Sequence, residues 1–178
     1  MFLAVLMITL LLTGCTVEKG QEEQIKEYYT DVERFSAQVR ATTVYPDKDY
    51  VFRFDYDYSR DEADLLVLTA PETVAGIEIA VNPDGTQIAH SGQMFETGSL
   101  GGRISTVGAL DFVLGQVKTG YLTSKSKEKI NGRPGICLGY TQQTQEQTIE
   151  TKAYFIENRL VKGEIYIDGG RAIELELA

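Results

Sequence analysis

The sequence predicts an α+β protein, in which a curved antiparallel sheet of about ten strands forms an open half-barrel and a helix covers its concave face. Three observations support this prediction. Apolar and polar residues alternate with a period of two in several segments, as in strands with one buried face. Short turn sequences rich in Gly, Asn, Asp and Pro separate these segments, so that most connections are short enough for hairpins. One apolar segment in the middle of the chain has helical spacing instead.

The chain begins with the pattern of a lipoprotein signal peptide. Residues 2–12 are apolar apart from Thr9, and Leu12-Thr13-Gly14-Cys15 has the order of a lipobox. The apolar segment has the length of a signal-peptide core, whereas a spanning helix needs roughly 20 apolar residues. We expect removal of residues 1–14 and attachment of lipid to Cys15, which would hold the protein on the extracytoplasmic face of the cell membrane. The alternative is a short membrane anchor or a buried helix with a chance cysteine.

The remaining chain divides into a lipidated tether, residues 15–20, and one domain, residues 21–178. The formal net charge is −9, and residues 1–14 carry none of it. Such an acidic body argues against nucleic-acid binding and against lying flat on an anionic lipid surface. With Cys15 lipidated, Cys137 has no disulfide partner. Because Cys137 lies in an apolar strand segment, we interpret it as a core residue rather than a reactive thiol.

The N-terminal half is predicted to contain a short helix, residues 21–29, and five strands. The first strand begins near Val32 and buries Phe35, Ala37, Val39 and Ala41. The second places four aromatic side chains on one face and Arg53, Asp55 and Asp57 on the other; the aromatic residues are Phe52, Phe54, Tyr56 and Tyr58. Segments 63–70, 76–81 and 86–90 follow, and the turn sequence Asn82-Pro83-Asp84-Gly85 separates the last two.

The C-terminal half is predicted to contain the helix and five further strands. Residues 92–103 are rich in Gly and are predicted to be irregular. We expect Ser105 to cap a helix that runs to Thr119 and Gly120 to end it. Its apolar face consists of Val107, Leu110, Val113, Leu114 and Val117. Strands are then expected over residues 127–130, 136–140, 148–156, 160–167 and 171–177, the last three as a meander.

The sequence contains no convincing catalytic, metal or cofactor motif. The single histidine, His90, stands beside Ser91, and neighbours on a strand point to opposite faces. Residues 55–61 begin like a calcium loop, but Arg60 replaces the required Gly and Leu66 the required Glu. Residues 98–102 precede a helix but lack the lysine of a phosphate loop. We therefore expect a protein that is not an enzyme and that has no catalytic residues, metal or cofactor.

The remaining candidates for a functional site are apolar residues. The apolar residues include the aromatic strand, the apolar side of the predicted helix and Phe112. One interpretation is ordinary core packing. The other is that the sheet curves away from the helix and leaves a cavity for an acyl chain. For that second interpretation the candidate ligand-binding residues are Phe52, Phe54, Tyr56, Leu110, Val113 and Leu114.

The order of these elements resembles a known family. The resemblance rests on the lipobox, the short helix, the paired strands, the motifs Pro71-Glu72-x-x-Ala75-Gly76 and Glu96-Thr97-Gly98-x-Leu100, the helix and the meander. The chain resembles the LolA/LolB-like superfamily, particularly lipoproteins of spore-forming Gram-positive bacteria similar to the GerS germination group. The resemblance implies an unclosed barrel with a helical lid and, for many members, a cavity that carries lipid or acyl chains. For GerS-type members it implies holding and activating a cell-wall amidase.

Three functional hypotheses follow. The first is a membrane-anchored, non-enzymatic lipoprotein that binds a lipid or acyl chain in the half-barrel. The second is a scaffold or activator for a cell-wall or spore-cortex enzyme, using exposed acidic strands and residues 92–103. The third is an enzyme, which would require buried acids around His90.

Overall fold

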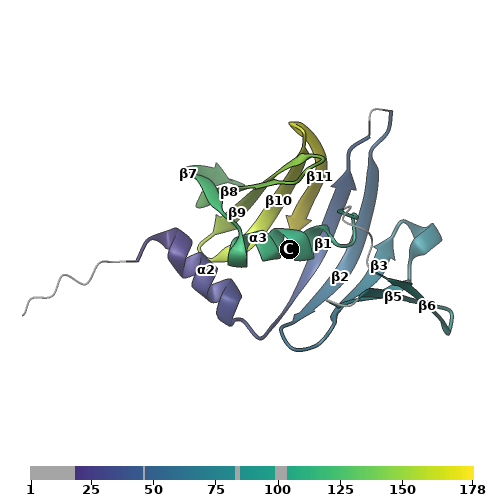
Figure 1. Ribbon diagram of the computed structural model, residues 1–178. Coiled ribbons are helices and arrows are strands. Elements are labelled where there is room, and N and C mark those ends of the chain that lie inside the picture. The colour runs from purple at the N-terminus through teal and green to yellow at the C-terminus, as the bar shows by residue number, and fades with distance from the viewer. Residues whose placement is uncertain (1–18, 46, 83–84, 99–103) are drawn as a thin grey trace, which may run out of the picture.

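The computed structural model describes residues 19–45, 47–82, 85–98 and 104–178 (Figure 1). The expected signal peptide and Cys15 lie outside the described residues, as do Pro83, Asp84 and residues 99–103. The fold prediction is confirmed: in the described ranges a single curved, unclosed antiparallel sheet is accompanied by two α-helices and a short 3₁₀ helix. The described part of this sheet contains eleven strands rather than about ten.

The elements follow one another along the chain with mostly short connections. The helices are α2 (Gln21–Asp31), the short 3₁₀ helix η2 (Glu72–Val74) and α3 (Ala109–Thr119). The strands are β1 (Arg34–Thr43), β2 (Tyr50–Ser59), β3 (Asp64–Ala70), β4 (Glu78–Asn82), β5 (Gly85–His90), β6 (Gln93–Gly98), β7 (Leu122–Ile130), β8 (Arg133–Gln143), β9 (Thr148–Ile156), β10 (Arg159–Ile167) and β11 (Gly170–Leu177).

Two meanders make up the sheet. Its strand order is β6-β5-β4-β3-β2-β1-β11-β10-β9-β8-β7, so every neighbour except β1–β11 is also a neighbour in sequence. The β1–β11 ladder pairs Val39 with Leu177 and Thr43 with Ile173 and thereby joins the two meanders. Figure 1 shows α3 between the two halves of the curved sheet, with α2 beside it.

Buried and exposed residues alternate along β2, and this alternation shows which face of the sheet is concave. Phe54, Tyr56 and Tyr58 are buried toward α3, while Asp55 and Asp57 are exposed on the convex face. The facing side of α3 buries Leu110, Val113, Leu114 and Val117. Gly163 of β10 allows this close contact, because an added Cβ would lie 3.3 Å from Cγ2 of Val113. The core therefore lies between α3 and the concave face.

Several boundaries differ from the sequence predictions, and three of these differences have a local cause. β6 forms inside the segment predicted to be irregular, because Ser91 and Gly92 adopt positive φ and make a tight hairpin turn. α3 begins at Ala109 and not at Ser105, whose Oγ instead accepts a hydrogen bond from the Gly108 N–H at 3.0 Å. Ser105 thus stabilises the turn before the helix. β7 begins at Leu122 rather than at residue 127, and its exposed residues carry no apolar alternation.

The helix ends at Thr119, and Gly120 is its C-cap, as predicted. None of the helices in the described ranges is long and apolar enough to cross a membrane.

Candidate functional site

The structure brings five of the six candidate ligand-binding residues together. Phe54, Tyr56, Leu110, Val113 and Leu114 belong to one core cluster in which each is at most 1% exposed. The sixth, Phe52, is half-buried and is not part of this cluster. These side chains pack α3 against the sheet. The cavities described below lie next to this cluster and not inside it.

One such space, which we call the α3 cavity, lies along the flank of α3 and has a volume of about 450 Å³. This volume is within the usual range of ligand pockets, about 300 to 1,000 Å³. Half-buried apolar side chains that pack against the core form much of its wall. The lining residues are Val81, Thr86, Ile104, Ser105, Val107, Gly108, Asp111, Phe112, Gln142, Thr144 and Ile149.

Asp111 is the charged side chain of this lining. Loss of surrounding water raises the pKa of its carboxyl, and the negative charge of Asp64 acts in the same direction, while Lys118 opposes both. Asp64 itself is buried, and it accepts hydrogen bonds from the Tyr56 hydroxyl at 2.5 Å and from the Ser59 N–H at 3.1 Å. A raised pKa makes the Asp111 carboxyl easier to neutralise when an apolar ligand displaces water.

A second space, the α2 cavity, lies where the end of α2 meets the start of β1 and the β9–β10 turn. Its volume is also about 450 Å³, and Leu114 is part of its wall. Arg133, Glu157 and Arg159 contribute charged side chains. Tyr29 accepts a hydrogen bond from the Leu160 N–H at 2.8 Å, and burial raises the pKa of Tyr29 to about 12. This wall is therefore more polar than that of the α3 cavity.

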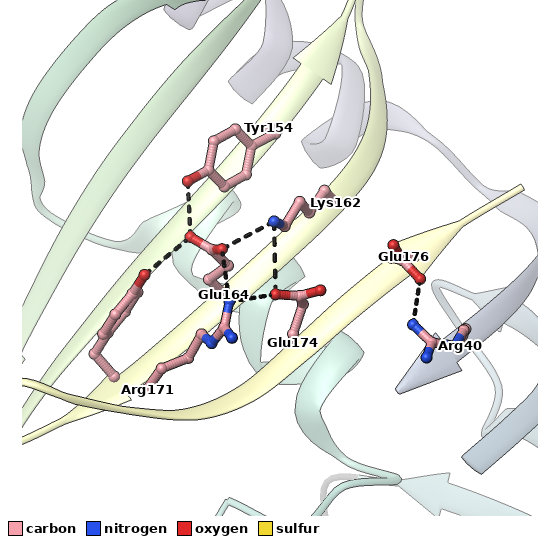
Figure 2. A network of polar contacts seen from close by, with 8 residues as sticks. Arg40, Tyr154, Lys162, Glu164, Arg171, Glu174 and Glu176 are labelled. Atoms are coloured by element: carbon pink, nitrogen blue, oxygen red, sulfur yellow. Dashed lines mark hydrogen bonds and ion pairs between the residues drawn. The ribbon is translucent and has the colours of Figure 1, made fainter. Parts of the chain in front are cut away.

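The convex face carries a polar network around Glu164, which is only 6% exposed (Figure 2). The Tyr154 hydroxyl donates to Oε2 of Glu164 at 2.7 Å, and the Tyr166 hydroxyl donates to the same atom at 3.1 Å. Nζ of Lys162 lies 2.9 Å from Oε1, and it also lies 3.6 Å from Glu174. Since the carboxylate has partners on both oxygens, we interpret the network as structural support for β9, β10 and β11.

The remaining sequence candidates lie apart. His90 is exposed at the end of β5. Among the described residues, no group of His, Cys, Asp or Glu could hold a metal ion. Cys137 is buried, as predicted, and burial raises the pKa of its thiol.

Comparison with known proteins gives fold likeness alone. No protein-family model matches the chain, and no curated protein sequence matches it. An uncharacterized conserved protein from Thermus thermophilus has a TM-score of 0.54 at 8% identity, with 89% of this chain and 85% of that chain covered. A LolA superfamily protein from Nitrosomonas europaea has a TM-score of 0.47 at 14% identity, over 89% and 90% of the two chains.

A further likeness is to a chain from the structure of the CwlD amidase of Clostridioides difficile in complex with the GerS lipoprotein. Its TM-score is 0.44 at 13% identity, over 92% of this chain and 96% of that chain. At these identities the likenesses concern the fold alone.

Proposed function

We propose that this protein binds a hydrophobic ligand, such as a lipid or acyl chain, in the α3 cavity, and that it does so as a lipid-anchored protein without catalysing a reaction. The observation that supports this most directly is the cavity wall itself. Ile104, Val107 and Phe112 pack against the core but remain partly accessible. A ligand that covers them gains about 0.8 kcal/mol for each methylene removed from water.

In this proposal five of the six residues singled out from the sequence, all except Phe52, support the ligand site from behind. Leu110 and Val113 fix α3 on the sheet, and the aromatic row of β2 packs against them in the same core. The residues in contact with the ligand come instead from the start of α3, from the segment just before it, and from β4, β5, β8 and β9. Val107 and Phe112, already recognised as apolar in the sequence, are the central pair.

Native mass spectrometry of the purified protein, with titration of a fluorescent fatty acid, tests this site. Val107→Trp fills the cavity and should displace a co-purified lipid and weaken fatty-acid binding at least about tenfold. Val67→Trp is the matched control, because Val67 lies on the convex face of β3 and is exposed. Equal binding by both variants, or a protein that neither carries nor takes up lipid, would overturn the proposal.

The membrane anchor has a separate test. Cys15→Ser removes the thiol that accepts diacylglycerol, so labelled palmitate should no longer be incorporated and the protein should leave the membrane fraction. Incorporation that persists in this variant would rule out Cys15 as the attachment site.

Partner binding is the second candidate function, as a scaffold or activator for a cell-wall or spore-cortex enzyme. The observation that favours it is apolar side chains exposed on the half of the sheet formed by β3 to β6. Leu65 is 51% exposed, Met94 is 68% exposed and Phe95 is 54% exposed. Large exposed apolar side chains are often found at protein interaction sites.

A further inference from the structure

The two edges of the sheet are built differently. β7 forms one edge and carries Lys125, Lys127 and Lys129, all exposed. Lysines on an edge strand prevent another chain from pairing with it. β6 forms the other edge, contains no Lys or Arg, and exposes Met94 and Phe95. The edge at β6 therefore lacks the protection that the edge at β7 has.

The backbone of β6 has groups available for pairing. Ser91 and Gly92 form a two-residue hairpin turn, and His90 and Gln93 face each other across it. Residues that flank such a turn bond to each other, so the peptide groups of the next residue, Met94, point away from β5. Within the described part of the chain no strand lies on that side.

A row of side chains on the convex face, apolar apart from Glu78, leads to this edge. The cross-strand register places Val67 opposite Glu78, Glu78 opposite Ala89, and Ala89 opposite Met94. Val67 and Met94 are exposed. A strand added beside β6 would therefore bring its own side chains against Met94, while Phe95 offers a second apolar contact on the opposite face.

The net charge around β6 determines which kind of added strand is attracted to it. Residues 54–98 contain nine Asp or Glu and one Arg, so nearly all of the net charge of −9 belongs to this part of the chain. Two copies joined through β6 would bring two such acidic regions together, and their repulsion disfavours a dimer of this kind. A segment with lysine or arginine is attracted instead.

We propose that β6 is a docking edge for an extended, cationic segment of a partner protein, which pairs with it as an additional strand and places the apolar side chains of one face against Met94. This inference rests on the second candidate function and specifies its mode: main-chain hydrogen bonds provide affinity, and the acidic surroundings provide the preference for basic partners.

The test uses a fluorescein-labelled ten-residue peptide of alternating valine and lysine as the probe, with an alternating valine and glutamate peptide as its control. The lysine peptide should bind the purified protein at least about tenfold more tightly, and added salt should weaken its binding. Hydrogen exchange should slow at amides of residues 93–98. An equal affinity for both peptides, or slowed exchange at β7 instead, would overturn the proposal.

Two substitutions of one residue separate strand pairing from apolar contact. Met94→Pro removes an outward N–H and should weaken peptide binding about tenfold, while the thermal midpoint stays close to that of the wild type. Met94→Gln keeps the N–H and should weaken binding less. Unchanged binding by Met94→Pro contradicts strand addition. If a partner protein is identified and binds the wild type and Met94→Pro equally, partner binding is retained as a function, but strand addition at β6 is rejected as its mode.

Discussion

Replacing Glu164 by Gln should lower the free energy of unfolding by about 2 kcal/mol at pH 7. The substitution keeps the size of the side chain and one acceptor for the Tyr154 hydroxyl, but it removes the charge that faces Lys162 at 2.9 Å. Exposed ion pairs contribute about 0 to 1 kcal/mol and broken buried pairs cost about 3 to 5 kcal/mol. Glu164 is buried but the side chain of Lys162 is 31% exposed, so an intermediate value is expected.

The loss should depend on pH in a defined direction. Burial alone would raise the pKa of the Glu164 carboxyl, but hydrogen bonds from Tyr154 and Lys162 and the charge of Lys162 outweigh it, and the pKa lies below its usual value of 4.5. A carboxyl with a lowered pKa in the folded state stabilises the fold above its unfolded pKa. The difference between the wild type and Glu164→Gln should therefore be complete at neutral pH and should shrink as the pH falls below 4.5.

Urea denaturation followed by circular dichroism, at pH 7 and in steps below pH 4.5, measures both effects. Glu176→Gln is the matched control, because Glu176 pairs with Arg40 at 2.7 Å while both side chains are more than 40% exposed. That control should cost less than about 1 kcal/mol. Equal losses for the two variants, or a difference for Glu164→Gln that does not change with pH, would refute the role assigned to the network.

Three further outcomes are expected. Leu110→Ala, at a fully buried position, should destabilise the fold by about 3 kcal/mol in thermal or urea unfolding, and a loss below about 1 kcal/mol would contradict the packing of α3. Gly163→Ala should cost about 1 kcal/mol because its Cβ meets Val113 at 3.3 Å, and a double-mutant cycle with Val113→Ala should show relief; additive costs would argue against this contact. Cys137 should react slowly with a thiol reagent in the native protein and rapidly in urea, and rapid native reaction would show that the thiol is accessible.

The architecture could be predicted because its signals are local. The alternation of aromatic and acidic residues in β2 reflects one buried and one exposed face, and it identified the concave side correctly. Helical spacing likewise identified the buried face of α3. β6 and the first half of β7 escaped prediction, because residues exposed at a sheet edge need no apolar alternation. The start of α3 was missed because Ser105 caps a turn instead of the helix.

The cavity was harder to predict than the fold, for a physical reason. The most apolar positions facing each other, such as Phe54 and Leu110, become the best packed, and a cavity forms where packing is incomplete. Its wall combines residues far apart in the sequence, among them Val81, Val107 and Ile149. Their meeting depends on the curvature of the whole sheet, which no local pattern encodes.

The single ladder between β1 and β11 also determines when folding can finish. Each meander consists of hairpins between consecutive strands, so it can form early and from local contacts. The five residue pairs from Val39–Leu177 to Thr43–Ile173, in contrast, close a loop of more than a hundred residues. β11 follows the other ten described strands in sequence, so a growing polypeptide holds two unconnected half-sheets, each with an open edge, until β11 has been made. Whatever keeps these edges from mispairing during folding acts before the concave face exists.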